Sequence, residues 1–441
     1  MDRKKRWRRT VELIKNVLIV ALSCSAVWLV SHIHQGELGV LSKNEVETTG
    51  VQQSEAGART DMARPLRMVI NRESTTGECV RYGVQYDTAR SDQMFQQVAS
   101  LLAEVLSSAG ELQEVTRSQW ELALAQAPGI VFDFQGNLPM EVLVGWLAEE
   151  ETHLTGNVRR MILTVFSGQV AVYYCAEETG LYYRCQSEIV SQNYLSDLVA
   201  DYVENGAYFA FEVEEYANLD PDTLILNSVP RPAVYTAVNP TAGGQADLEA
   251  LMDDLGLVGN SSFYPAEDSQ VARLGSDTLR LYENGVVVYQ AGEKGNGFFS
   301  VPSRGEIPSQ YEAVEACRRI VASTLGTRCG TARYYLSSVQ ETDNGLEIMF
   351  NYCLNGSVVH LEQGYAARFL VEKGQITQFW LCLRNYTDSG KTSVVMPVRQ
   401  AVAVMEAQGL DGMELLLVYS DTGSETVTAS WEAIGSDRGE R

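Results

Sequence analysis

Strand-type runs separated by short turn signals recur along the chain and restrict its fold more than any other feature. In RLYENGVVVYQ, residues 280–290, Asn284-Gly285 divides two such runs, and RFLVEKGQITQFWLCL, residues 368–383, repeats the form. An Asn-Gly pair between strand-forming residues predicts a β-hairpin with a two-residue loop. We therefore expect several small antiparallel sheets.

Helical patterns precede these strand runs. Residues 245–257, QADLEALMDDLGL, place four apolar side chains on one helical face: Leu248, Leu251, Met252 and Leu255. A helix followed by a meander is expected at 245–290, at 309–386 and, in shorter form, at 397–434. Each unit can bury one sheet face beneath its own helix, so the predicted fold class is α+β.

The order of these patterns, with a length of 441 residues, predicts several domains behind one membrane anchor. The expected organisation is a basic tail at 1–15, a transmembrane helix at 16–33, a flexible stalk at 34–65, an N-terminal α+β domain at 66–225, a central helix-plus-meander domain at 226–305 and a C-terminal α+β domain at 306–441.

The run NVLIVALSCSAVWLVSHI, residues 16–33, contains no Asp, Glu, Lys or Arg. As a helix, 18 residues extend roughly 27 Å, close to the thickness of a bilayer's hydrocarbon core. Residues 1–15 carry seven basic and two acidic side chains, a local charge of 7 − 2 = +5. The positive-inside rule therefore predicts a single-pass cell-membrane protein with a cytoplasmic N-terminus and an extracytoplasmic body.

A cleaved signal peptide is the competing interpretation of the same run. Cleavage requires small residues at set positions after the apolar segment. The following SHIHQGELG has no A-x-A pattern, and the apolar run is long for a signal peptide. The sequence favours an uncleaved anchor.

The charge balance excludes one class of partner. The whole chain carries a net charge of −23, so the part after residue 15 carries −23 − 5 = −28. Binding to nucleic acid depends on a basic surface that neutralises phosphates. We expect no nucleic-acid partner.

Two local patterns give further expectations. The segment SDQMFQQVASLLAEVLSSAG, residues 91–110, has apolar residues at helical spacing, a start signal at Ser91-Asp92 and a stop at Gly110. The Pro-rich VPRPAVYTAVNP, residues 229–240, is expected to form an extended connector.

Seven cysteines lie after the predicted anchor. Cys175 and Cys185 flank a predicted hairpin, and a loop of odd length would place them opposite each other, within disulfide reach. Cys317 with Cys329, and Cys353 with Cys382, are further candidate pairs, since the sequence does not set the connectivity. Buried thiols with one or two structural disulfides are the simpler interpretation.

No catalytic or metal-binding motif stands out. The four histidines, His32, His34, His153 and His360, have no partner at H-E-x-x-H spacing, and neither G-x-S-x-G nor C-x-x-C occurs. The Gly-rich GEKGNG, residues 292–297, leads into FFSVP rather than a helix, so it is expected to connect strands rather than bind phosphate.

Acidic clusters are the remaining candidates for chemistry. They are Glu149–Glu151, Asp253-Asp254, and EVEEYANLDPD, which begins at Glu212 and includes Asp220 and Asp222. The last could hold a calcium ion, although it does not match an EF-hand loop. A solvated acidic face is the default interpretation. A glycosidase pair cannot be recognised from sequence, because it is defined by separation in space.

Four segments carry a resemblance to a known family. VYTAVNP and FYPAEDSQVARLGSDTLRLYENGVVVYQA, residues 234–240 and 263–291, resemble the central domain of YycH/YycI-type proteins. GYAARFLVEKGQITQFWLCLRNY and LLLVYSDTGSETVTASWEAI are similar to the PepSY-like C-terminal halves of that family. The resemblance covers about 225–441 and the anchor, whereas residues 66–225 match more by position than by motif.

The resemblance implies a function without an active site. Proteins of this type are membrane-anchored regulators of an essential two-component system that controls cell-wall metabolism in Gram-positive bacteria. It implies contact with a sensor histidine kinase through the transmembrane helix and with a second YycH/YycI-like subunit, and no cofactor or small-molecule substrate. The residues assigned to the partner-facing side are Val17, Ala21, Ser25 and Trp28.

Other functions stay open at this stage. Small residues in the span permit close helix packing, but a plain lipid-facing anchor has the same composition. An extracytoplasmic wall- or sporulation-associated enzyme with a spatially assembled acidic site is one alternative. A PepSY-type module that inhibits a protease is another.

Overall fold

The computed structural model describes residues 55, 57–257, 261–292, 297–305 and 307–435. No helix within these ranges combines the length and the apolarity needed to cross a bilayer. The predicted transmembrane helix at 16–33 lies outside the described residues and stays a prediction.

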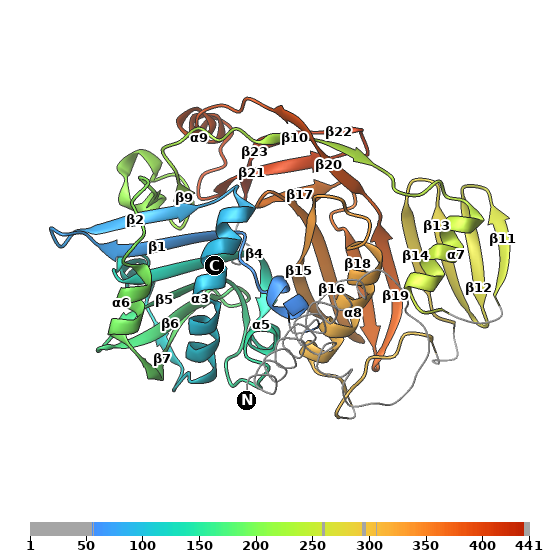
Figure 1. Cartoon of the computed structure of the whole chain (residues 1–441), viewed down its shortest axis with the longest axis horizontal. Coiled ribbons are helices and arrows are strands. Elements are labelled where there is room, and N and C mark those ends of the chain that lie inside the picture. Colours follow the sequence, from blue (N-terminus) through green and yellow to red (C-terminus); the bar gives the residue numbers. More distant parts are fainter. Residues whose placement is uncertain (1–54, 56, 258–260, 293–296, 306, 436–441) are drawn as a thin grey trace, which may run out of the picture. The chain divides into compact units, whose positions relative to one another are not determined.

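An antiparallel sheet, here called the N-terminal sheet, is built from the first strands of the chain (Figure 1). In spatial order it contains β2 (Cys79–Val84), β1 (Arg67–Glu73), β4 (Gly129–Pro139), β5 (Asn157–Phe166), β6 (Gln169–Ala176), β7 (Leu181–Ser191) and β3 (Gln113–Val115). Strand residues alternate between its faces, so Ile70 and Phe132 enter one core while Val69 and Val131 enter another.

Helices cover both faces of this sheet. On one face lie α3 (Thr88–Ser107), α5 (Met140–Leu147) and α6 (Gln192–Val199), and on the other lies α4 (Arg117–Ala125). The apolar residues that predicted the first of these helices are buried, as expected. Its start differs from the prediction, because the side chain of Asp87 caps it by accepting from the Arg90 N–H, one turn before Ser91.

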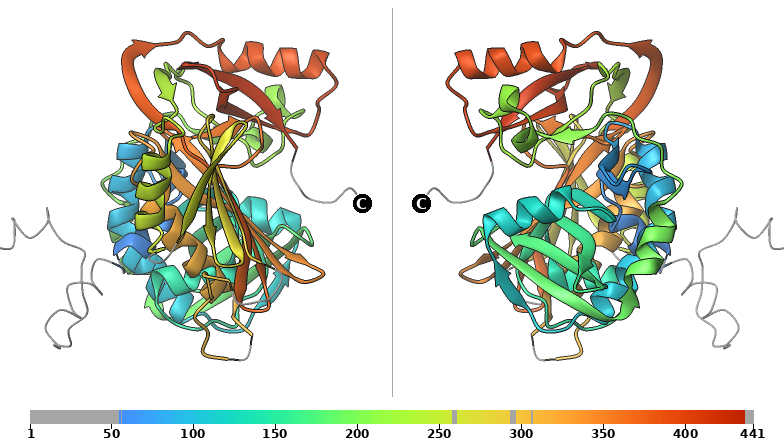
Figure 2. Two further views of the ribbon diagram at one scale, coloured as in Figure 1. Left: turned by 90° about the vertical axis from the view of Figure 1, so that its right-hand side faces the viewer. Right: turned by 90° about the vertical axis from the view of Figure 1, so that its left-hand side faces the viewer.

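A second antiparallel array, the central sheet, confirms the predicted helix-then-meander order. Its strands run β11 (Ser262–Ala266), β12 (Ser269–Leu274), β13 (Asp277–Tyr282), β14 (Val286–Gln290), β19 (Gln375–Cys382), β18 (Ala367–Glu372), β16 (Gly345–Leu354) and β15 (Arg333–Thr342). Its two helices are α7 (Gln245–Asp254) and α8 (Gln310–Thr324), and α7 lies against the β12–β13 side in Figures 1 and 2.

Both hairpins that the sequence marked are present in the central sheet. The two-residue loop predicted for the first was wrong, because Leu281 pairs with Val287 and residues 283–285 form a three-residue loop. Gly285 has a φ of +85° and donates its N–H to the Tyr282 carbonyl, closing the turn between β13 and β14. Lys373 and Gly374 both have positive φ between β18 and β19, as a two-residue hairpin turn requires. The two meanders join through β14 and β19, which pair antiparallel.

β4 links the two sheets. Its first half pairs with β1 and β5, the register shifts between Asp133 and Leu138, and Asn137 then pairs in parallel with Ser338 of β15. Gly136 is required at this crossing, because a Cβ there would lie 2.2 Å from the Leu336 carbonyl oxygen. A bulge of this kind redirects a strand from one sheet to another.

The C-terminal part adds short ladders. β17 (Ser357–Leu361) pairs in parallel with β21 (Glu414–Asp421), which pairs with β23 (Ala429–Ile434), and α9 (Val398–Ala407) packs beside them, coloured red in Figure 2. A second ladder joins β10 (Ala233–Val238) to β20 (Asn385–Thr392) and β22 (Thr426–Val427). Between these parts of the chain, β8 (Tyr208–Phe209) pairs with β9 (Leu224–Ile225).

The expected extended connector at 229–240 was wrong in part. The prolines at 230, 232 and 240 flank a run of strand-forming residues, and that run is β10. Its partners lie about 150 to 190 residues further along the chain, beyond the reach of local pattern analysis.

Ordered structure begins before residue 66, where the sequence analysis placed it. Residues 57–62, within the predicted stalk, are helical, and Met62 and Ala63 are buried. The domain bounds drawn from the sequence stay a prediction, although β10–β20 and β14–β19 pair across them.

One cluster of buried charges, the Glu414 cluster, joins the N-terminal sheet to β21. Arg67, Asp133 and Arg160 lie directly across from one another on β1, β4 and β5. Glu414, the first residue of β21, accepts from Arg67 at 2.6 Å and from Arg159 at 2.5 Å, and lies 2.6 Å from an Arg160 nitrogen. The cluster therefore connects chain positions 347 residues apart.

The cluster keeps Glu414 ionised. Burial alone raises the pKa of a carboxyl group, but the three arginines outweigh this effect and lower the pKa of Glu414 to about 2. Removing one partner of such a cluster leaves buried charge uncompensated, which costs more than the cluster contributes.

We predict that Glu414→Gln destabilises the full chain by about 3–5 kcal/mol, because three arginines would lose their shared carboxylate. Chemical denaturation followed by circular dichroism measures this change. Glu425→Gln at an exposed position is the control and should stay within about 0.5 kcal/mol of the native chain.

The pH dependence gives a second readout of the same variant. Because the folded pKa of Glu414 is depressed, its stabilisation is present above about pH 4.5 and is lost as the pH falls toward 2. The native chain should lose stability over that interval more steeply than Glu414→Gln. Equal slopes would show that Glu414 is not charged in the folded state.

Candidate functional site

The two described histidines each contact a different partner. His153 Nε2 lies 3.0 Å from the Gly110 carbonyl oxygen, and His360 Nδ1 lies 2.9 Å from a Glu432 carboxylate oxygen. Over the described ranges, no group of three or more His, Cys, Asp or Glu side chains is arranged to hold a metal ion. His32 and His34 lie outside those ranges.

The acidic stretch at 212–222 is only in part the solvated face that the sequence suggested, because Glu214 and Glu215 are exposed whereas Asp220 and Asp222 are buried. Asp222 is fully buried and takes a two-pronged ion pair from Arg117, with nitrogen–oxygen distances of 2.6 and 3.1 Å. Trp120 Nε1 donates to the same carboxylate at 3.3 Å, and Glu212 pairs with Arg81. Asp222 and Glu212 thus neutralise arginines of α4 and β2.

The Gly-rich segment at 292–297 is described only at its ends, and both ends bond to one carboxylate. Gly292 N donates to Asp277 at 2.9 Å and Phe298 N donates at 3.1 Å, while the Tyr289 hydroxyl donates at 2.6 Å. Burial opposes ionisation of Asp277, but these bonds prevail and lower its pKa. In the described residues the next named element after β14 is the helix α8, so the segment does not lead from one strand to another as predicted.

A second buried cluster, the Glu315 cluster, holds α5, α8 and the helical residues 57–62 together. Glu315 on α8 accepts from Trp146 Nε1 of α5 at 2.7 Å, from Arg318 at 2.8 Å and from Arg59 at 3.2 Å. Burial raises the pKa of Glu315, and the bonds from Arg318 and Trp146 reverse this effect and lower it. One carboxylate thus links three segments that are distant in sequence.

Gly145 allows α5 and α8 to approach closely. A Cβ at this position would lie 2.6 Å from the ring of Tyr311 on α8. The close packing and the Glu315 cluster together place the C-terminal end of α5 beside the start of α8 (Figure 1).

An open cleft of about 1270 Å³, here called the acidic cleft, lies beside this contact. One wall is formed by α5 and the segment that follows it, and the other by the start of α8 and the end of β15. Its described lining contains seven glutamates and two arginines, a difference of 2 − 7 = −5; these residues are Glu141, Glu149, Glu150, Glu151, Glu178, Glu312, Glu341, Arg59 and Arg304.

Three of the seven glutamates contact other groups of the fold. Glu312 caps α8 by accepting from the Ser309 and Arg304 backbone N–H groups, and Glu178 accepts from the Asn157 N–H. Glu149 lies 3.5 Å from Arg59. The other four glutamates form no ion pair with a described residue: Glu141, Glu150, Glu151 and Glu341.

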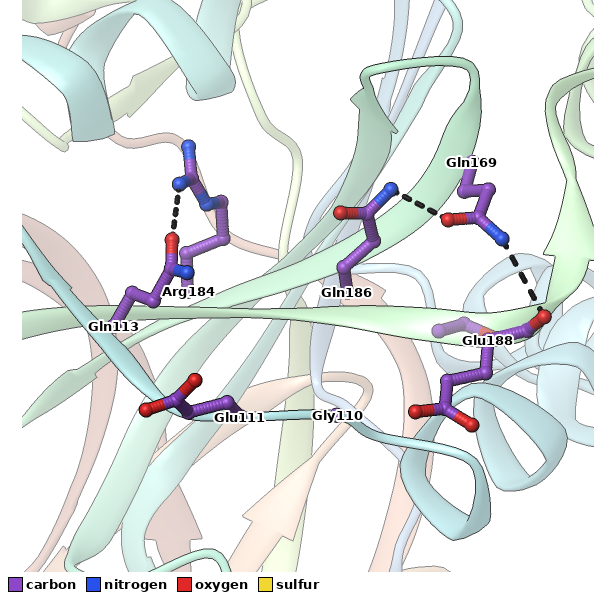
Figure 3. A pocket seen from close by; sticks show the side chains of 8 residues that line it. Gly110, Glu111, Gln113, Gln169, Arg184, Gln186 and Glu188 are labelled. Atoms are coloured by element: carbon purple, nitrogen blue, oxygen red, sulfur yellow. Dashed lines mark hydrogen bonds between the residues drawn. The ribbon is translucent and has the colours of Figure 1, made fainter.

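Two other hollows are smaller than the acidic cleft. One of about 280 Å³ lies over β3 and β7, and Figure 3 shows that its polar side chains bond to each other. Arg184 donates to Gln113 at 2.5 Å, and Gln186 donates to Gln169 at 2.7 Å. The other, of about 390 Å³, lies between β21 and the segment before β10, with Trp431 in its wall.

The predicted Cys175–Cys185 disulfide was wrong. The β6–β7 hairpin pairs Ala176 with Leu181 across a loop of four residues, an even number, so Cys175 faces Tyr182 and Cys185 faces Val172. All seven cysteines in the described ranges are free thiols, and only Cys79 among them is exposed.

The partner-facing residues assigned from the sequence cannot be placed. Val17, Ala21, Ser25 and Trp28 lie outside the described residues, so their role stays a prediction. The acidic cleft was not predicted, since its walls come from segments about 160 to 280 residues apart in the chain.

Comparison with known proteins adds evidence on the fold. No family model matches the sequence, and no curated protein matches it. Among solved structures, the crystal structure of YycH from Bacillus subtilis matches with a TM-score of 0.51 at 10% sequence identity. The match covers 85% of this chain and 94% of that one.

The chain has the YycH fold. The resemblance seen in the sequence is thereby confirmed at the level of the fold, and the α+β class is confirmed with it. Because 85% of the chain is covered, the match also includes much of 66–225, where the sequence carried no motif. At 10% identity the likeness concerns the fold alone.

We predict that thiol alkylation of the native full chain modifies Cys79 and spares the other six cysteines of the described ranges, because those six are buried. Burial also raises the pKa of the Cys79 thiol, so the reaction should be slow at pH 7 and faster at pH 9. Peptide mapping by mass spectrometry measures each site, with urea-unfolded protein as the control. Loss of two hydrogens between Cys175 and Cys185 in untreated protein would contradict the structure.

Proposed function

We propose that this chain is a non-enzymatic, membrane-anchored regulator that acts on a sensor histidine kinase from the outer side of the cell membrane. The observation that carries the proposal is the YycH fold, shared over 85% of the chain. The family that the sequence resembles consists of regulators of a two-component system for cell-wall homeostasis, and the fold supports placing this chain among proteins of that kind.

Features of the N-terminus support the membrane part of the proposal. Residues 16–33 are long and apolar enough to span a bilayer, and the basic residues precede them. Small side chains at Ala21 and Ser25 would let a kinase helix approach closely. The body that follows is strongly acidic, which suits a role outside the cell away from nucleic acid.

A PepSY-type protease-inhibitory module is the second candidate. The observation that favours it is the pair of helix-plus-meander units formed by α7 with β11–β14 and by α8 with β15, β16, β18 and β19. An extracytoplasmic enzyme with an acidic site has less support, because the Asp220–Asp222 region is engaged with arginines.

The two candidates separate in one co-purification experiment. We predict that the tagged full chain, extracted from membranes of its host with mild detergent, recovers a sensor histidine kinase. The double substitution Ala21→Leu with Ser25→Leu should lower that recovery about fivefold, the factor that about 1 kcal/mol of helix packing represents. Quantitative mass spectrometry measures the recovery.

Ser23→Leu with Ala26→Leu is the matched control, because at 100° per residue these positions lie on the opposite face of the predicted helix. Its recovery of the kinase should equal that of the native chain. Equal losses of kinase recovery for both double variants would show that the assigned helix face does not bind the kinase. Recovery of a protease without a kinase would favour the inhibitory module.

A further inference from the structure

One edge of β15 is open where it borders the acidic cleft. β15 pairs with β16 along one side, and on its other side the described residues pair with it only at Ser338, where β4 contacts it. The next residues, Val339, Gln340 and Glu341, line the cleft. An open strand edge presents unpaired backbone groups to any extended chain that approaches it.

The hairpin register shows which groups face the cleft. Thr342 pairs with Gly345 across a two-residue loop, so this closing pair exchanges both backbone hydrogen bonds. Alternate residues along β15 therefore bond to β16, and the backbone groups of Glu341 and Val339 point the other way. The Val339 carbonyl has a distant donor in Asn157 at 3.5 Å, while no described residue outside the hairpin bonds to the Glu341 backbone.

The side chains around this strand edge indicate which kind of ligand would fit there. Glu150, Glu151 and Glu341 are exposed and form no ion pair with a described residue. Ile307, 83% exposed, also lines the cleft and provides an apolar contact. The volume of about 1270 Å³ exceeds the roughly 300–1,000 Å³ of ordinary small-molecule pockets, so a polypeptide segment fits it better.

We propose that the acidic cleft is a docking groove for an extended, Lys- or Arg-rich segment of a partner protein. The segment adds a strand to β15 at Glu341, and its cations pair with the carboxylates that the fold leaves unused. Backbone pairing contributes affinity, and the alternating side chains contribute specificity. The proposal is independent of the span and of kinase regulation, so either can fail without the other.

Three synthetic peptides test the proposal against the full chain in detergent micelles. The first is a fluorescent octapeptide of alternating Lys and Val, the second replaces Lys by Glu, and the third replaces Val by Pro. We expect the Lys-Val peptide to bind and the Glu-Val peptide not to bind. The Lys-Pro peptide should bind at least about tenfold more weakly, because proline lacks the N–H that strand pairing needs. Fluorescence anisotropy measures each Kd.

Variants that remove charge inside or outside the cleft test where the peptide binds. Glu150→Gln with Glu151→Gln should weaken binding of the Lys-Val peptide about fivefold, as expected for the loss of two exposed ion pairs. The matched control, Glu204→Gln with Glu362→Gln, removes the same charge at exposed positions away from the cleft and should change the Kd by less than about twofold. Equal weakening by both pairs would overturn the proposal in favour of diffuse attraction.

A backbone variant isolates the strand edge. Glu341→Pro removes the outward N–H together with the carboxylate, whereas Glu341→Gln removes only the charge, and proline is tolerated at a strand edge whose N–H faces outward. We expect binding to fall further for Glu341→Pro than for Glu341→Gln at equal melting temperatures. Equal affinities of these two variants, or of the Lys-Pro and Lys-Val peptides, would overturn strand addition.

Discussion

Glu414 determines how the two ends of the described chain fit together. Its buried carboxylate contacts three arginines of the N-terminal sheet, of which Arg67 and Arg160 are buried and Arg159 is partly buried. The position of these charges therefore restricts where β21 can pack. A buried cation without its anion is strongly unfavourable, which makes the docking specific as well as stable. The bulge in β4 and the Glu315 cluster complete the link by joining both sheets beside α5 and α8.

The Glu315 cluster also holds the walls of the acidic cleft together. The acidic cleft is lined by α5, α8, β15 and the helical residues around Arg59, and the Glu315 cluster bonds three of these four segments to one carboxylate. Arg59 stands 26 residues after the predicted span, so the cleft includes the described residues that are nearest to that span in the sequence. Under the docking and the membrane anchor proposed above, a partner in the cleft would contact the segment that follows the predicted span.

The sequence predicted those features that depend on neighbouring residues. The apolar spacing between Met94 and Leu106 identified a buried helix face, and turn signals placed the β13–β14 and β18–β19 hairpins. Pairing between distant strands could not be predicted from local patterns. The strand β10 was mistaken for a connector. The register around Cys175 was predicted wrongly, because the hairpin loop has an even number of residues. One signal of the Glu414 cluster is present in the sequence but was overlooked. Arg67, Asp133 and Arg160 each interrupt a strand that is otherwise largely apolar. A charge at such a position requires a buried partner, although the sequence does not say that Glu414 supplies it.

Native-state hydrogen exchange of the full chain, followed by mass spectrometry over a urea series, tests most directly whether the buried charges make one cooperative unit of these segments. Peptides from β1, β4 and β21 should exchange with the same opening free energy and the same dependence on urea. If β21 and β23 instead open at a clearly lower free energy with a shallow urea dependence, while β1 and β4 stay protected, the C-terminal strands are a separate unit and the account is contradicted.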